Sequence, residues 1–180
     1  MLTSTDFSGL INDRFVQNFL PIPATNTLSQ GMLTPNFELL DVTNNQTVKL
    51  ADYRGEVPII LAFTRIFTEK QYCPFCYPHI KELNDRYEEF RDREVELWMI
   101  TSTDERQSKT VVQDLGLKMP LLIDPSCRVF RLYQTGQALG APLPAQFVLD
   151  DRGRLQYKHL FSFLDHNASV DKLLEVVDQL

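Results

Sequence analysis

The chain has 180 residues, of which 43% are hydrophobic and 11% aromatic, values typical of a globular domain with a buried core. Its formal net charge is −6 and no lysine/arginine cluster stands out, which disfavours nucleic-acid binding. Residues 1–10 lack the basic start and apolar stretch of a signal peptide, and no apolar run is long enough to span a membrane, so we expect a cytoplasmic protein without a membrane partner.

The first 33 residues have the pattern of an extension ahead of the main domain. Apolar residues at helical spacing predict an amphipathic helix, and two prolines end it: Phe7, Leu10, Ile11, Phe15 and Phe19, then Pro21 and Pro23. Such a helix either packs on its own domain or forms a contact in a homodimer. We expect residues 34–180 to form a single domain.

From residue 35 onward, strand-like and helix-like segments alternate. The predicted strands cover residues 37–42, 47–50, 57–64, 95–101, 121–123, 146–149 and 155–160. The predicted helices cover the run from the paired cysteines to about residue 91, then residues 104–115, 128–133 and 170–177, the last capped by Asn167. This order predicts an α/β fold in which helices cover both faces of a central mixed sheet.

The most informative motif is Cys73-Pro74-Phe75-Cys76, a C-x-x-C pair between a predicted buried strand and a predicted helix. A reactive cysteine must be a thiolate, and the unpaired N–H groups and dipole of a helix start favour a negative sulfur. Pro74 suits the first helical position. We therefore predict that Cys73 is a solvent-facing nucleophile and that Cys76, one turn later, forms a disulfide with it. No cofactor is expected.

Other interpretations of individual residues stay open at this point. The two cysteines of the motif, with His79 or Cys127, could bind zinc, although the chain lacks a second C-x-x-C or a paired histidine. Cys127 is either a small buried residue or an alternative resolving thiol. His79 is expected at the surface or an interface rather than as a catalytic base. Arg65 either favours the Cys73 thiolate or is a solvated loop charge.

Four blocks in the same order resemble the peroxiredoxin-like, AhpC/TSA branch of the thioredoxin-like superfamily. They are Thr-Pro-Asn-Phe-Glu-Leu at 34–39, Leu-Ala-Asp-Tyr-Arg-Gly at 50–55, Phe-Thr-Arg at 63–65 with Tyr-Cys-Pro-Phe-Cys at 72–76, and Pro-Ala-Gln-Phe-Val-Leu-Asp-Asp-Arg-Gly at 144–153. The resemblance runs from about residue 34 to the end. It implies a thioredoxin-like fold and a redox enzyme that uses a thioredoxin- or glutathione-type reductant.

The chain also departs from the pattern of ordinary peroxiredoxins at three positions. Lys70 stands where that family has a threonine, Arg65 where it has a proline, and Pro144 where it has an arginine. In the family these groups polarise the peroxide, so their replacement favours exchange with a disulfide substrate over reduction of a hydroperoxide. Pro144 instead resembles the cis-proline that thioredoxin-like proteins place against their C-x-x-C.

Three functions therefore remain. The favoured one is a thiol-disulfide oxidoreductase that cycles between the Cys73/Cys76 dithiol and disulfide, with Pro144 shaping a substrate groove. The alternative is a thiol peroxidase that acts through a Cys73 sulfenic acid, with Arg65 as the first candidate to polarise the peroxide. The last is a metal-binding or non-catalytic interaction module.

Overall fold

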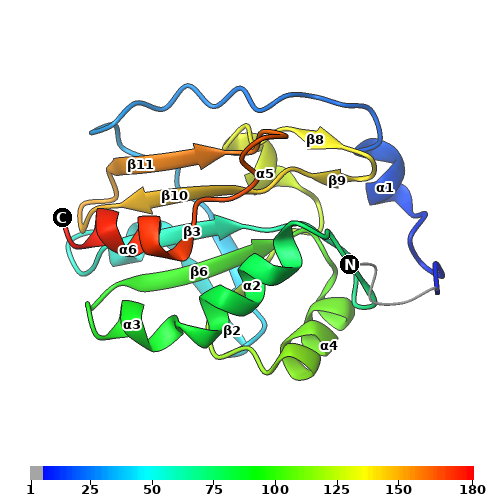
Figure 1. Cartoon of the computed structure of the whole chain (residues 1–180), viewed down its shortest axis with the longest axis horizontal. Helices are drawn as coiled ribbons and strands as arrows, with labels where there is room; N and C mark the ends of the chain where they lie inside the picture. Colours follow the sequence, from blue (N-terminus) through cyan, green and yellow to red (C-terminus); the bar gives the residue numbers. More distant parts are fainter. Residues whose placement is uncertain (1–5) are drawn as a thin grey trace.

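A computed structural model describes residues 6–180 (Figure 1). Its main sheet contains β1 (Glu38–Asp41), β2 (Gln46–Lys49), β3 (Ile59–Phe63), β6 (Glu96–Thr101), β7 (Leu121–Ile123), β10 (Ala145–Leu149) and β11 (Leu155–Leu160). The seven strands lie in the order β11-β10-β3-β6-β7-β1-β2. β3, β6 and β7 are parallel. Antiparallel strands extend the sheet at both edges.

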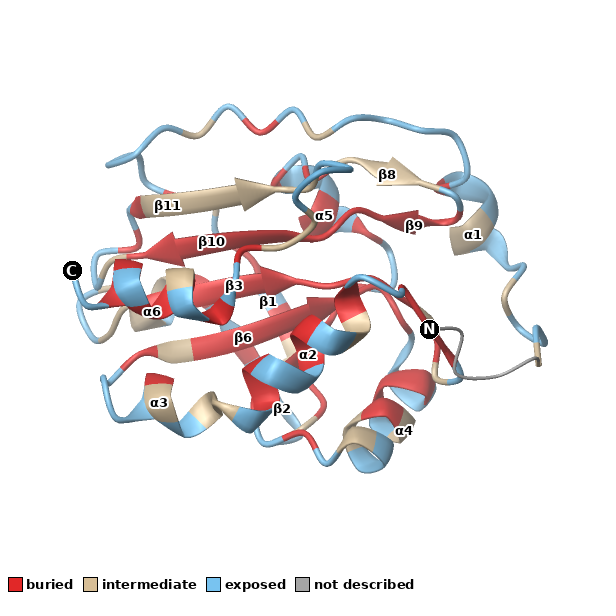
Figure 2. Cartoon of the chain, viewed as in Figure 1, coloured by how far each residue is buried: buried red, intermediate tan, exposed pale blue. Residues whose placement is uncertain are grey.

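Helices cover both faces of this sheet, which confirms the predicted α/β fold (Figure 1). One face carries α2 (Cys76–Asp85), α3 (Tyr87–Arg91), α4 (Glu105–Leu115) and α6 (Val170–Val177), and the other carries α5 (Arg128–Leu132). The central strand β3 is buried on both sides, as expected for a strand in the middle of a sheet that helices cover on both faces (Figure 2). Ile60 and Ala62 contribute to the first face, and Leu61 and Phe63 to the second.

Two helix boundaries differ from the prediction. The helix after the cysteines is interrupted at Arg86, whose φ of −102° and ψ of 15° separate α2 from α3. At that point the Asn84 side chain bonds the backbone of Gly116 and Lys118, which ties the end of α2 to the chain after α4. The predicted cap of α6 is wrong, because Ser169 and not Asn167 accepts the N–H of Lys172.

The amphipathic helix predicted near the N-terminus is shorter than its apolar pattern suggests. Only α1 (Asp13–Gln17) is helical, because Gly9 turns the chain with a φ of 76° and the Asn12 side chain caps the N–H of Phe15. Residues 1–5 of the predicted extension lie outside the described residues. Within residues 6–180, no helix has the length and apolar character needed to cross a membrane.

After α1 the chain runs along the outside of the domain (Figure 1). Ile22 forms a bridge with Gln137 in the small hairpin of β8 (Gln137–Ala138) and β9 (Ala141–Pro142). Further on, Leu33 pairs with Arg154 at the start of β11. The described part of residues 1–33 is therefore attached to the domain by backbone pairing at both of these points.

Candidate active site

The connection from β3 to α2 folds back on itself before it reaches the cysteines. β4 (Ile66–Thr68) pairs with β5 (Gln71–Tyr72) in a short antiparallel hairpin. This hairpin returns the chain toward the end of β3, where the N–H of Cys73 donates to the carbonyl of Arg65 over 3.3 Å. The hairpin therefore brings two of the predicted site residues, Arg65 and Cys73, together.

Cys73 is buried rather than solvent-facing, so that part of the prediction is wrong. Its exposed fraction is 4%, because the hairpin carries both Tyr72 and Cys73 into the core. The helix begins only at Cys76, after a turn through Pro74 and Phe75. The Cys73 carbonyl accepts the N–H groups of Cys76 and Tyr77, each at 3.0 Å. Cys73 thus precedes the helix and lies at the beginning of the turn formed by Pro74 and Phe75.

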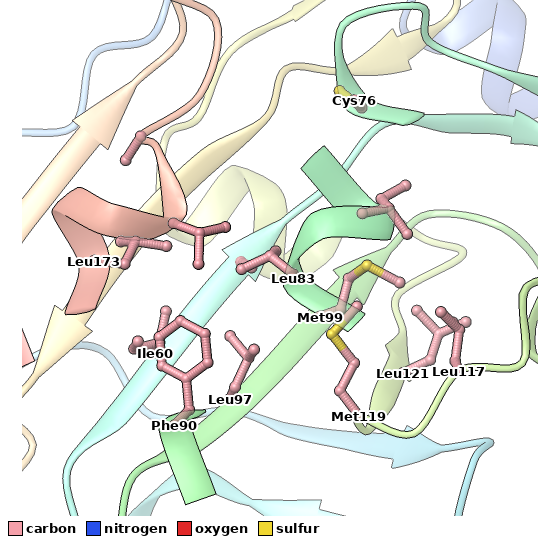
Figure 3. Close-up of a cluster of buried hydrophobic side chains, with 14 of the residues drawn as sticks. Ile60, Cys76, Leu83, Phe90, Leu97, Met99, Leu117, Met119, Leu121 and Leu173 are labelled. Atoms are coloured by element: carbon pink, nitrogen blue, oxygen red, sulfur yellow. The ribbon is translucent and has the colours of Figure 1, made fainter. Parts of the chain in front are cut away.

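The surroundings of the two thiols shift their pKa values in opposite directions. The largest contribution that lowers the pKa of Cys73 is a hydrogen bond with the Cys76 thiol, followed by the backbone N–H groups of Phe75 and Cys76 and by the charge on Arg65. Together these interactions lower the pKa of Cys73 to about 6 in spite of its burial. The same hydrogen bond raises the pKa of Cys76, as do its complete burial and the charge on Cys73. Figure 3 shows Cys76 at one end of the buried apolar cluster that includes Leu83 and Met99.

Arg65 is not a solvated loop charge. Its guanidinium is buried, and Nη2 donates to the carbonyls of Ala138 and Leu139 in the turn between β8 and β9. The guanidinium carbon lies 4.8 Å from the centre of the Phe67 ring. Burial lowers the pKa of Arg65, whereas the neighbouring Cys73 sulfur raises it. Nε is buried with no hydrogen-bond partner among the described residues.

Pro144 lies at the same end of the sheet. Ala145 pairs with Phe63, which places Pro144 beside the end of β3, where the loop toward Cys73 begins. The peptide bond before Pro144 is trans, so the expected cis-proline is wrong. The trans form is the lower-energy state of an X–Pro bond, and Leu143 bonds its N–H to the Gly136 carbonyl in this arrangement.

His79 is buried, contrary to the surface position predicted for it. Its Nε2 lies 2.9 Å from the Ala168 carbonyl, which requires the neutral ring to carry its proton on that nitrogen. Burial lowers the pKa of His79 to about 4. These contacts give His79 a structural position between α2 and the start of α6.

Cys127 is also buried, as expected for a lone cysteine. It belongs to the core on the α5 face, whereas Cys73 and Cys76 belong to the core on the opposite face. Asn18 Nδ2 lies 3.7 Å from its sulfur, and burial raises its pKa. Within residues 6–180, no group of three or more histidine, cysteine or acidic side chains is arranged to hold a metal ion.

The loop between β11 and α6 also contributes to this site, although no sequence motif marks it. The His166 ring stacks on Phe75 with centroids 3.7 Å apart and an interplanar angle of 8°, and Asn167 donates to the Phe75 carbonyl. Phe75 itself is 52% exposed. One signal was present in the sequence: Gln146 is the single polar residue in the otherwise apolar strand β10, and it bonds this loop.

Comparisons with known proteins identify the family of this chain. The family model described as the AhpC/TSA family matches residues 31–158. A putative peroxiredoxin, ycf42 of Porphyra purpurea, is 24% identical over 168 residues, covering 88% of this chain and 81% of that protein. The thiol-disulfide oxidoreductase ResA of Bacillus cereus is 26% identical over 129 residues, covering 71% and 68%.

Among solved structures, peroxidoxin BcpB from Mycobacterium tuberculosis superposes with a TM-score of 0.70 at 20% identity, covering 85% of this chain and 98% of that one. This likeness concerns the fold, whereas the family model covers most of the chain and includes both cysteines of the motif. The chain is thus related to peroxiredoxins and to thiol-disulfide oxidoreductases alike. It belongs to the AhpC/TSA family and is an oxidoreductase with a thioredoxin-like fold.

Proposed function

We propose that the protein is a thiol-disulfide oxidoreductase that works through a Cys73/Cys76 dithiol-disulfide cycle. The observation that carries the proposal is the turn that joins the two cysteines, in which the Cys76 N–H donates to the Cys73 carbonyl over 3.0 Å and both side chains enter the same core. The interaction between the two thiols lowers the pKa of Cys73 and raises that of Cys76, the combination that an attacking thiolate and a resolving thiol require.

The cycle follows from these two acidities. The Cys73 thiolate attacks one sulfur of a substrate disulfide, the substrate S–S bond breaks, and its second sulfur leaves as a thiolate with the electron pair. In the resulting mixed disulfide Cys73 is uncharged, so neither its charge nor its hydrogen bond raises the pKa of Cys76 any longer, and only burial still does. Cys76 then gives up its proton, attacks the Cys73 sulfur and breaks the mixed disulfide, and the reduced substrate leaves as a thiolate that takes up a proton. A thioredoxin-type dithiol, or two glutathione-type thiols, restores the Cys73/Cys76 dithiol and is itself oxidised to a disulfide.

A second function, thiol peroxidase, is favoured by a different observation. The unpartnered Nε of Arg65 is an N–H donor beside Cys73, suited to a peroxide oxygen. In this reaction the Cys73 thiolate attacks one peroxide oxygen, the O–O bond breaks, and the leaving oxygen takes a proton. The Cys73 sulfenic acid then condenses with Cys76 and releases water. The peroxiredoxin relatives support this alternative.

Parallel turnover assays test the two functions. The purified protein is supplied with a dithiol reductant and with either a protein disulfide or a hydroperoxide. We expect faster turnover of the disulfide, no turnover of either substrate by Cys73→Ser, and a trapped mixed disulfide with Cys76→Ser. Cys127→Ser is the matched control and should behave as the wild type. Rapid peroxide turnover with the protein disulfide left unreduced would reject the first proposal in favour of the second.

A further inference from the structure

A chain of side-chain hydrogen bonds connects the sheet to the turn that carries the cysteines. The N–H of Ala168 donates to Gln146 Oε1 over 2.7 Å, and Gln146 Nε2 donates to Asn167 Oδ1 over 2.9 Å. Asn167 Nδ2 in turn donates to the carbonyl of Phe75 over 3.1 Å. Gln146 is fully buried in β10, so the chain of bonds starts from a rigid part of the fold.

The orientation of both amide groups follows from the first of these bonds. A backbone N–H can only donate, so Gln146 must turn its oxygen toward Ala168 and its NH₂ toward Asn167. Asn167 must then accept with its oxygen and direct its own NH₂ at Phe75. A flipped amide at either position would break two of the three bonds.

The target of Asn167 matters because of peptide geometry. The Phe75 carbonyl and the Cys76 N–H belong to one planar peptide unit, in which the two groups point in opposite directions. The Cys76 N–H donates to the Cys73 carbonyl over 3.0 Å, and it is also one of the backbone N–H groups that lower the pKa of the Cys73 thiol. Holding the carbonyl of this unit therefore holds its N–H, and a hydrogen bond at the carbonyl strengthens donation at the other end.

We propose that Asn167, oriented by Gln146, is a positioning residue that fixes the peptide unit between Phe75 and Cys76 so that its N–H stays directed at Cys73. Asn167 acts through the backbone, from a loop that follows the segment matched by the family model. The inference rests on the proposed function only in taking Cys73 as the nucleophile.

The expected effect is on the acidity of Cys73. N–H groups that donate to a thiolate stabilise the charged form, so a misdirected Cys76 N–H raises the pKa of Cys73. The titratable and charged groups that act on the Cys73 sulfur are Cys76 and Arg65. Neither side chain is altered when Asn167 is replaced, so the change acts first on the peptide unit that Asn167 bonds.

The test is the pH dependence of Cys73 alkylation, read by mass spectrometry of the reduced protein. Asn167→Leu keeps a similar volume and charge but removes the donor, and we expect its midpoint to rise by about 0.5–1 pH unit. Ser162→Ala is the matched control, because Ser162 Oγ bonds only Asp165 within the same loop. Its midpoint should equal that of the wild type.

An unchanged midpoint in Asn167→Leu would overturn the proposal, and so would an equal rise in Ser162→Ala, which would show that general loosening of the loop is the cause. Thermal melting checks that each variant is folded, and Asn167→Ala takes the place of Asn167→Leu if the larger side chain prevents folding. Alkylation needs no substrate. Labelling of Cys76 before Cys73 in the wild type would therefore reject the assigned thiol roles, separately from the result at Asn167.

Discussion

The ring of Phe15 lies directly on Gly140, with no space for a side chain between them. A Cβ on Gly140 would lie 2.0 Å from Phe15 Cδ2. The φ of Gly140 is 90°, a conformation that favours glycine, and its N–H donates to the Asn18 carbonyl over 3.0 Å. This contact docks α1 onto the turn between β8 and β9, the same turn whose carbonyls Arg65 bonds.

Gly140→Ala should therefore lower the free energy of unfolding by more than the backbone strain of an alanine at positive φ would cause. Gly55 is the matched control, since its φ of 92° is nearly the same but no atom lies within 4 Å of its would-be Cβ. We expect Gly55→Ala to lower the free energy of unfolding by about 1–2 kcal/mol through backbone strain. Gly140→Ala should lose about 1–3 kcal/mol more through the clash with Phe15. Urea unfolding measures both, and equal losses would show that Phe15 moves aside without cost.

Replacing Cys76 should change the reactivity of Cys73 according to whether a donor remains. Cys73 is a thiolate above about pH 6 and loses reactivity as the pH falls through its pKa. Cys76→Ala removes the hydrogen-bond donor, so the pH at which Cys73 loses its reactivity should rise by about 1–2 units. That hydrogen bond is the largest of the interactions that lower the pKa of Cys73. Cys76→Ser keeps a hydroxyl donor and should stay near the wild type. Alkylation rates against pH give the comparison, and identical profiles for the two variants would contradict it.

Arg65 combines a charge with hydrogen bonds to the β8–β9 turn, and two variants separate these roles. Arg65→Met should raise the alkylation midpoint of Cys73 by about half a pH unit, a small effect because its charge is the least of the stabilising contributions. Arg65→Lys keeps the charge and should keep the midpoint. Both variants should melt at lower temperature than the wild type, since both lose the forked bonds to Ala138 and Leu139. A raised midpoint in Arg65→Lys would assign the effect to turn geometry instead.

His79 should make the protein sensitive to mild acid. Its pKa is lowered from 6.5 to about 4 in the folded state, so the unfolded state binds the additional proton between these values. Its contribution to stability is complete above pH 6.5 and is lost as the pH falls toward 4, by about 2–3 kcal/mol. His79→Gln keeps an N–H donor for the Ala168 carbonyl but does not titrate. Urea midpoints at pH 7.5 and 4.5 should differ less in this variant, and an unchanged difference would contradict the assignment.

Much of this fold was predictable because its strands are short, apolar and bounded by turns. The continuous apolar run of β3 and the hairpin at Asp150–Gly153 are local signals, and the structure confirms both elements. The two cysteines were recognisable for the same reason, since a C-x-x-C after a buried strand and before a helix is a local pattern.

The burial of Cys73, and the contacts between the β11–α6 loop and the turn that carries the cysteines, were not predictable from local patterns. They depend on contacts between segments far apart in the chain, such as the bond between Asn167 and Phe75. The short β4–β5 hairpin has only five strand residues and left no clear periodic signal, yet it decides whether Cys73 faces water. Asn167 was assigned to a helix cap because asparagine is common there, but Ser169 takes that position and leaves Asn167 to bond the turn.

The hydrogen bonds around the Cys73 sulfur also bear on the energetics of electron transfer. The donation from Cys76 and from the peptide N–H groups is strong while the sulfur carries a charge, and a Cys73–Cys76 disulfide gives it up. Oxidation to the disulfide therefore removes interactions that stabilise the dithiol form. Their loss raises the reduction potential of the pair by about 30 mV for every 1.4 kcal/mol of thiolate stabilisation. For the proposed cycle this means that even a weakly reducing thiol reduces the disulfide, and that the dithiol, with Cys73 ready to attack, is the favoured form wherever thiols are abundant.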